Sequence, residues 1–478
     1  MENQIYFLSQ NLALVLVVSS SLIFAVIGIL YSRKYRGLTN YLVAGRKIGP
    51  LSLTSSLVAS ALGTWILFGP ASAATWGGIG SVVGYSLGTA FPMIALIYLG
   101  KKIRKVFPSG ITFTQFIYHK IGKNLFKLIL LLSIFYMFIF LCAEVTAVST
   151  LINYISGTPL WITATFIIVT TLIYTLYGGL RASILTDNFQ FLIILILLLI
   201  CGYNLFAFDY ISYELIQNNS GNLLSAKYIP NYTAGLTFFV AVTATNLFHQ
   251  GNWQRVFAAK NYEVLNKSLK LSFLIIVPIV FFMGTCGIIA VSIDSTINPD
   301  LAFFSILLRD KSEFLSMVVI ILAISLTVST TDTLINAISS LIFVDGKKIN
   351  KNLKSSNTFV IVISIVSLVV ASKGFGILYL FLLADLLCCA AVFTVFYAFY
   401  KKNLKEKDLI LSIILGLFLG LLFFPSSDFS NSILVGTLMP FDLFPEIIRN
   451  YLLFWSFLFA TVGPIIFILF RGSLIKLN

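Results

Sequence analysis

Seven oxygen-bearing side chains lie within nine consecutive positions, 325–333, of the apolar stretch 324–340, ISLTVSTTDTLINAISS. They are Ser325, Thr327, Ser329, Thr330, Thr331, Asp332 and Thr333. The surrounding apolar run, Phe314 to Val344, has about thirty residues and is therefore long enough to cross a membrane, where an acidic group is costly. Hydroxyl and carbonyl oxygens are the ligands of small hard cations. We interpret this stretch as half of a sodium site in a transporter.

A purely structural role for these hydroxyls is the alternative. Serine and threonine side chains inside a helix can donate to carbonyls one turn earlier and can help helices to pack. That explanation suffices for any single hydroxyl. Asp332 within the cluster favours an ion, because a buried acid needs a compensating partner.

A second polar span, residues 51–77, is interrupted by Gly63, Gly69 and Pro70. Broken backbone inside a membrane is tolerated only where it is buried in protein or lines a cavity, because its freed carbonyls need partners. A bound cation is one such partner. A glycine and serine face that packs against another helix is the alternative.

Residues 232–250 form a third such span, which ends in a polar run around Gly251. This run brings amides and an imidazole into the membrane, from Asn246, His249, Gln250 and Asn252. For His249 we keep open both a structural role and a role as a gate or substrate contact.

Three more acids lie in or beside apolar spans: Glu144, Asp187 and Asp385. Glu144 could contact substrate, be protonated or bond to a neighbouring helix. Asp187 opens a predicted span, where the helix dipole favours an acid, so helix capping is the default and a place beside a cation path is the alternative. The pattern assigns no role to Asp385.

The composition requires a membrane protein. Of 478 residues, 58% are hydrophobic and 10% are charged, whereas globular proteins have roughly 25% charged residues. We predict an all-α polytopic protein with about thirteen transmembrane helices. The candidate spans are 12–31, 51–77, 79–99, 125–155, 160–177, 185–207, 232–250, 266–292, 314–344, 357–372, 376–400, 409–424 and 450–470.

The net charge of +14 follows the topology of these spans. If the N-terminus is outside, 27 of the 32 Lys and Arg residues lie in cytoplasmic segments, including the cluster from Arg255 to Lys270. This asymmetry follows the positive-inside rule and places the C-terminus in the cytoplasm. The basic residues therefore indicate contact with the lipid bilayer, and we predict no nucleic-acid partner.

The order of the spans predicts two inverted five-helix repeats, because spans 51–77 and 232–250 are both polar and interrupted by glycine. The predicted units are an extra helix with its linker (1–50), the first repeat (51–207), the second repeat (232–400) and a peripheral helix pair (401–478). Between them no segment is long enough for a catalytic domain. The sequence also lacks a His/Cys metal cluster, a serine elbow and a phosphate loop, so we do not expect an enzyme.

Three motifs together resemble the sodium:solute symporter family, whose members carry sugars, proline, sialic acid, pantothenate, iodide, choline and urea. The motifs are YGGLRA at 177–182 with the following Thr186, Asp187 and Gln190, QRVFAAKN at 254–261, and ST-x-D-T from Ser329 to Thr333. The likeness covers nearly the whole chain. It implies alternating access between two inverted repeats, driven by Na⁺.

The resemblance also implies a set of ligands. Its common sodium site corresponds here to the backbone oxygens of Ala59, Leu62 and Leu326 with the hydroxyls of Ser329 and Thr330. A second cation, which some relatives hold, corresponds to Asp187, Ser329, Asp332 and Thr333.

The substrate is expected beside the sodium, between the spans 51–77, 125–155, 232–250 and 376–400. The candidate residues are Thr64, Trp65, Phe68, Glu144, His249 and Gln250. Some members, including proline carriers, have an acid where this chain has Ala61, which weakens a proline assignment. The aromatic and polar mixture suits a small organic solute such as an amino acid, urea or a sugar.

We therefore predict a Na⁺-coupled symporter of the plasma membrane that imports a small organic solute. One alternative is coupling to H⁺ through Asp187 and Asp332. Another alternative is a membrane sensor. We do not favour it, because the eight residues that follow the last span are too few for a signalling domain. The sequence predicts no oligomeric state.

Overall fold

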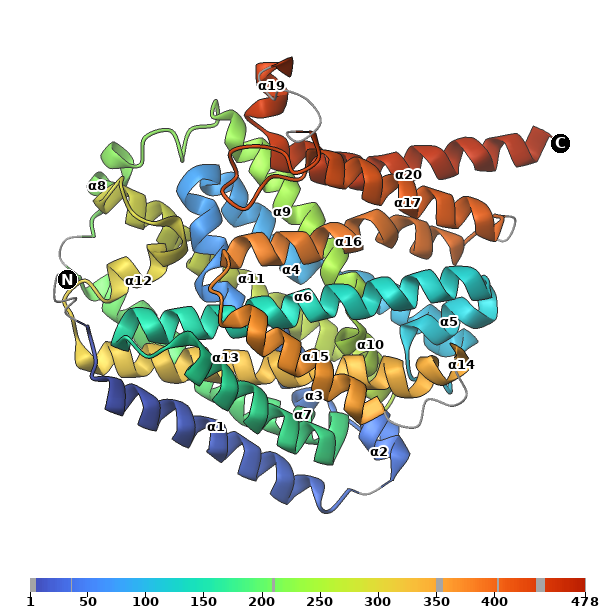
Figure 1. Ribbon diagram of the computed structural model, residues 1–478, viewed down its shortest axis with the longest axis horizontal. Helices are drawn as coiled ribbons and strands as arrows, with labels where there is room; N and C mark the ends of the chain where they lie inside the picture. The colour runs from blue at the N-terminus through green and yellow to red at the C-terminus, as the bar shows by residue number, and fades with distance from the viewer. Residues whose placement is uncertain are drawn as a thin grey trace.

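The computed structural model describes residues 6–35, 37–208, 211–349, 356–401, 404–435 and 443–477. These residues form helices and no β-strand, apart from two isolated bridges. Most of the long helices run roughly horizontally or obliquely across Figure 1. The N-terminal end of the described chain lies at the left of the view with α8 and α12, whereas α5, α14 and the C-terminal end lie at the right.

The helices follow one another along the chain in this order. They are α1 (Gln10–Ser32), α2 (Leu38–Val43), η1 (Ala44–Arg46), α3 (Pro50–Ala61), η2 (Thr64–Leu67), α4 (Gly69–Val106), α5 (Phe113–Lys120), α6 (Lys123–Ser156), α7 (Leu160–Ala207), α8 (Tyr213–Asn219), α9 (Ile229–Phe248), α10 (Gln250–Ala258), α11 (Tyr262–Ile293), η3 (Pro299–Leu301), α12 (Ala302–Leu307), α13 (Glu313–Ser340), η4 (Leu341–Gly346), α14 (Lys347–Ile349), α15 (Ser356–Ala371), α16 (Ile377–Ala398), α17 (Glu406–Phe423), α19 (Glu446–Arg449) and α20 (Leu452–Leu477).

Two of the longest helices, α4 and α7, each join two of the predicted spans through a sharp bend. The bends lie at Gly78 (φ +56°) and Gly179 (φ +58°), in a backbone region that glycine adopts without a steric penalty. Eight helices in the described part of the chain are long and apolar enough to cross a membrane. The all-α membrane fold is confirmed, while the count of thirteen spans stays a prediction.

Both predicted interruptions are present. Helix α3 ends at Ala61, and after Leu62 (φ −94°, ψ 82°) and the extended Gly63 the chain resumes with η2 and then α4. Helices α9 and α10 are separated by His249, whose backbone is extended (φ −66°, ψ 112°). Each break frees backbone groups inside the protein.

Glycines allow α4 to pack closely against α9 and α11. A Cβ atom at Gly80 would lie 1.7 Å from the carbonyl oxygen of Asn231 in α9, and one at Gly287 in α11 would lie 2.0 Å from the carbonyl oxygen of Ala71. Small residues of this kind let membrane helices approach backbone to backbone. The packing holds the segment that follows the first break against the segment that precedes the second.

Helix α13 is buried along almost its whole length. It contacts α7, α6, α3 and α1, so its polar stretch faces protein and not lipid. Helices α17 and α20 pack against each other and against α16 along one side (Figure 1).

Candidate functional site

The first break, between α3 and η2, is stabilised by hydrogen bonds to α6 and α13. Glu144 of α6 accepts hydrogen bonds from the backbone N–H groups of Thr64 (2.8 Å, to Oε2) and Trp65 (3.5 Å, to Oε1). The hydroxyl of Thr64 also pairs with that of Thr327 in α13. Glu144 therefore satisfies the amide groups that the break leaves without helical partners.

The carbonyl oxygens of Ala59 and Leu62 accept no hydrogen bond from any residue that the structure describes. The hydroxyl of Thr330, on α13, is likewise buried and without a hydrogen-bond partner among the described residues. Thr330 borders the same small cavity as Ser60 and Ala61 at the end of α3. The break and the polar stretch of α13 therefore meet, with unsatisfied oxygens on both sides.

Beside this meeting point lies a buried ion pair. The Arg255 guanidinium, from α10, lies 2.8 Å from Asp187 Oδ2 in α7, and both side chains are 0% exposed. Ser329 Oγ of α13 donates to Asp187 Oδ1 (2.6 Å), and Ser56 Oγ of α3 donates to Oδ2 (2.5 Å). Four helices are thus tied together through one carboxylate.

Asp332 lies next to this pair but has no basic partner among the described residues. Its carboxylate accepts hydrogen bonds from Tyr174 (2.5 Å), Ser183 (2.7 Å) and Thr186 (3.3 Å), all on α7. The adjacent Thr333 receives a bond from Arg255 (2.9 Å). The four residues that the resemblance assigns to a second cation are therefore brought together, with Arg255 in contact with two of them.

Sequence reasoning did not foresee the burial of Arg255. It counted Arg255 among the basic residues of cytoplasmic segments, which stays a prediction, whereas in the structure its side chain on α10 is completely buried. The available signal was Asp187, a membrane acid that needed a counter-charge. Helix capping by Asp187 was also wrong, because α7 continues through the bend at Gly179 and Asp187 lies two turns beyond it.

The cavity beside Thr330 is central and small, about 30 Å³. Twelve residues from α3, η2, α4, α6, α9, α13 and α16 line it, together with His249 between α9 and α10: Ser60, Ala61, Trp65, Tyr85, Phe140, Val242, Thr245, Asn246, His249, Thr330, Phe381 and Asp385. We call it the central cavity. Its size admits little more than a water molecule in this conformation, so a solute needs the surrounding helices to move apart.

Two of the six predicted substrate residues, Trp65 and His249, line the central cavity. Thr64 and Glu144 lie in the adjacent break. Phe68 is outside the cavity and contacts Phe304 of α12 edge to face (5.0 Å between ring centres). Gln250 ties α10 to α5, because its Oε1 accepts the backbone N–H of Phe113 (3.0 Å).

His249 has the structural role that the sequence left open, and because it also lines the central cavity its role as a gate or substrate contact stays a prediction. Its Nδ1 accepts the backbone N–H of Gly251 (2.9 Å) and so caps α10. This bond assigns the ring proton to Nε2 and leaves the imidazole neutral, with a donor to offer.

Sequence reasoning missed Tyr85, Thr245, Phe140, Phe381 and the place of Asp385 in the cavity. Asp385 accepts a hydrogen bond from Thr245 (2.5 Å, to Oδ1). The aromatic residues gave no signal, because in an apolar span they resemble residues that face lipid or pack against other helices.

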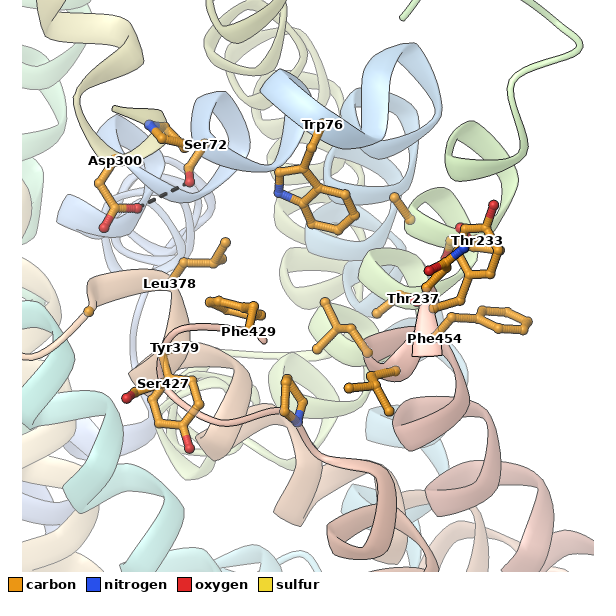
Figure 2. A pocket seen from close by; sticks show the side chains of 18 of the residues that line it. Ser72, Trp76, Thr233, Thr237, Asp300, Leu378, Tyr379, Ser427, Phe429 and Phe454 are labelled. Carbon is orange, nitrogen blue, oxygen red and sulfur yellow. Dashed lines mark hydrogen bonds between the residues drawn. The ribbon is translucent and has the colours of Figure 1, made fainter. Parts of the chain in front are cut away.

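A larger cavity of about 420 Å³ lies nearer the end of the molecule that carries α12 (Figure 2). Trp76 of α4, Thr237 of α9 and Tyr379 of α16 border it, as do the segments around Pro299 and Phe429. Ser72 donates to Asp300 at its edge (3.1 Å). Burial raises the pKa of Asp300 above its ordinary value, and the bond from Ser72 opposes that shift.

We call the cavity of about 420 Å³ the outer cavity, because it lies nearer one end of the molecule. A series of rings in mutual contact begins at Trp76, in the outer cavity, and leads to the central cavity. Trp76 contacts Phe238 (5.9 Å between ring centres), which stacks on Tyr85 (4.6 Å), which stacks on Trp65 (5.6 Å). Tyr85 and Trp65 line the central cavity. The rings therefore separate the two cavities in this conformation.

The sequence profile of the sodium:solute symporter family matches residues 41–416, most of the chain. The chain belongs to this family. Among curated proteins, the spermidine transporter DUR31 of Candida albicans (strain SC5314 / ATCC MYA-2876) is 27% identical over 461 residues, covering 94% of this chain and 86% of the relative. The predicted family membership is confirmed.

Solved structures agree on the fold. A Na⁺-coupled sialic acid symporter in a substrate-bound outward-open state superposes with a TM-score of 0.72 at 14% identity, covering 97% of both chains. A nucleobase-cation-symport-1 family transporter, in a closed conformation with bromovinylhydantoin bound, gives 0.56 at 16% identity, covering 90% of this chain and 96% of its own. This chain of the sodium:solute symporter family is therefore a multi-pass membrane protein and a solute transporter.

Proposed function

We propose that this protein is a Na⁺-coupled symporter that imports a small organic solute by alternating access. The observation that carries the proposal is the meeting of unsatisfied oxygens from two separate elements. The carbonyls of Ala59 and Leu62 lack donors, and the Thr330 hydroxyl lacks a partner, among the described residues. A small hard cation supplies what these oxygens lack.

The ion site consists of the backbone oxygens of Ala59, Leu62 and Leu326 and the hydroxyls of Ser329 and Thr330. Ser329 is bonded to Asp187 (2.6 Å), which links this site to the ion pair with Arg255. Na⁺ bound here ties α3 to α13. Since Thr330 also borders the central cavity, the ion and the solute influence the same side chains.

The second predicted cation group, Asp187, Asp332 and Thr333, already contains one positive charge. Arg255 balances one of the two carboxylates, and Asp332 is bonded only to neutral side chains. One further monovalent cation would neutralise the group if Asp332 is ionised. That cation is a second Na⁺ or, in the alternative form of the proposal, the coupled H⁺.

Coupling is mechanical and involves no covalent chemistry. Na⁺ entering from outside favours the form in which the solute site is complete, and solute binding then permits closure and release inside. Each charge that crosses 100 mV contributes about 2.3 kcal/mol. In this proposal the protein lies in the plasma membrane with its N-terminus outside and its C-terminus in the cytoplasm.

The name of the curated relative gives the order of a substrate screen. Because that relative is a spermidine transporter, polyamines come first, followed by amino acids, urea and sugars.

The proposal keeps the predicted organisation of the chain. Two inverted repeats, at 51–207 and 232–400, are flanked by an extra helix before residue 50 and by two peripheral helices after residue 401.

The test is uptake in proteoliposomes with Ser329→Ala and Thr330→Ala. Each variant loses one ion ligand, so we expect the Na⁺ concentration for half-maximal uptake to rise about tenfold, equivalent to about 1.4 kcal/mol. The controls are Ser325→Ala, whose hydroxyl bonds only to Ile321 O in its own helix, and Thr331→Ala, a neighbouring threonine outside the cavity.

Unchanged Na⁺ dependence in both ligand variants would remove their assignment. Uptake that follows a pH gradient and ignores Na⁺ would establish the H⁺-coupled alternative. Solute binding without any uptake would favour the sensor.

A further inference from the structure

One acid in the central cavity has no counter-charge. Asp385 of α16 is 5% exposed, and Oδ1 accepts the hydroxyl of Thr245 (2.5 Å). Oδ2 has no hydrogen-bond partner among the described residues, and none of their basic groups lies within ion-pair distance. A buried carboxylate in this state is costly, and the cost is removed when a cation binds beside it.

The walls of the central cavity offer aromatic rings. Trp65 and Tyr85 stack on one another (5.6 Å between ring centres, 18° between planes). Phe140 and Phe381 meet edge to face (4.8 Å, 65°). Ring faces attract ammonium groups electrostatically, and the attraction grows when both partners are shielded from water.

No cationic side chain competes for Asp385 among the residues that line the central cavity. Arg255 is committed to Asp187, Ser56 and Thr333. The only ring nitrogens in the cavity lining are those of Trp65 and His249, and the Gly251 amide fixes the imidazole as a neutral donor. Glu144, the other nearby acid, is already occupied by two backbone amides.

From these observations we propose that the solute is an organic cation whose ammonium group binds between Asp385 and the rings of Trp65, Tyr85, Phe140 and Phe381. This proposal depends on the proposed function for transport itself. The four-ring series from Trp76 to Trp65 provides further ring faces on the way inward. An acidic residue, Asp300, and a basic residue, Arg449, both line the outer cavity, so its lining does not favour one sign of charge. We therefore assign the selection of a cationic solute to the central cavity.

The experiment uses ligand pairs that differ in charge and little in shape. Choline is compared with 3,3-dimethyl-1-butanol, in which carbon replaces the charged nitrogen, and putrescine with 1,4-butanediol; spermidine is added as a third cation. Binding to the full-length protein in detergent is followed by thermal shift and by Trp fluorescence at saturating Na⁺. We expect saturable binding of at least one cation and at least a tenfold weaker effect of its neutral partner.

Asp385→Asn should weaken binding of that cation at least tenfold and abolish its advantage over the neutral partner. Phe381→Leu, which removes one ring face, should weaken the cation alone, severalfold. The matched control is Asp294→Asn, which removes an equal charge from an exposed loop and should change nothing. Stabilisation by Na⁺ without solute is measured in every variant as the test of folding and of the ion site.

The outcomes separate the two proposals. Three results would overturn the ammonium site: equal binding of neutral and charged partners, no binding of any of the three cations, or full cation binding by a folded Asp385→Asn protein. If Na⁺ still stabilises the protein in those cases, the proposed Na⁺ coupling stands. If Na⁺ does not stabilise the unmodified protein at all, the proposed function is overturned instead.

Discussion

Asp187 and Arg255 form the one ion pair among the described residues in which both partners are completely buried. It joins α7 to α10, and through Ser56 and Ser329 it also reaches α3 and α13. Burying two charges is expensive, and their mutual attraction offsets that expense only while both are present. The pair therefore matters most through what remains when one partner is removed.

Arg255→Ala should lower the free energy of unfolding by about 3–5 kcal/mol, because Asp187 is left buried without a counter-charge. The measurement is thermal or denaturant unfolding in detergent. Removing both charges with Asp187→Leu and Arg255→Met should restore a large part of the loss. Arg33→Ala, at an exposed arginine, is the control. A single variant as stable as the unmodified protein would contradict the role assigned to the pair.

Residues of different kinds were predictable to different degrees. The hydroxyl cluster on α13 was visible because oxygens in an apolar span are exceptional. Asp385 was visible as an acid but could not be placed, because its surroundings come from α9, α4 and α6, far away in sequence. Tyr85, Phe140 and Phe381 were invisible, since rings are ordinary in such spans.

Among the elements, the contact between α4 and α9 depends on residues without side chains. Gly80 and Asn231 touch backbone to backbone, and Gly84 meets Gly235 in the same way. Asn231 also accepts the N–H of Gly80 through its side chain (3.0 Å). These contacts fix α9, and with it Thr245, against the helix that carries Tyr85.

Gly80→Ala should destabilise the protein by about 1–3 kcal/mol, because the new methyl group would lie 1.7 Å from a backbone oxygen and the helices must separate. Unfolding in detergent measures the change. Gly202→Ala provides the control, since its methyl group would meet only Phe282, at 3.6 Å. Equal stability of the two variants would mean that the helices adjust freely.

The breaks were the best-predicted features of the elements. Glycine, proline and serine in the middle of an apolar span predicted the interruption between α3 and α4, and a polar run after residue 245 predicted the one between α9 and α10. The burial of Arg255 on α10 could not be predicted, because its partner Asp187 lies on α7, far away in sequence.

For the whole molecule, the proposed function predicts that transport moves charge. With one Na⁺ and a neutral solute, an inside-negative potential of 100 mV should raise accumulation by up to about 50-fold, equivalent to about 2.3 kcal/mol. An organic cation adds its own charge and steepens the response. The potential is set with K⁺ and valinomycin in proteoliposomes. Accumulation that ignores the potential would exclude net charge movement.

The sequence by itself determined that this is an all-helical membrane protein of the sodium:solute symporter family with polar, broken helices, because membrane burial makes every polar group and every break conspicuous in one chain. The tertiary structure alone decided which polar groups are partnered. Hydrogen bonds and ion pairs act over a few ångströms between helices distant in sequence. Glu144 was thereby assigned to the backbone and Asp187 to Arg255, which left Asp385 facing a cavity without a counter-charge.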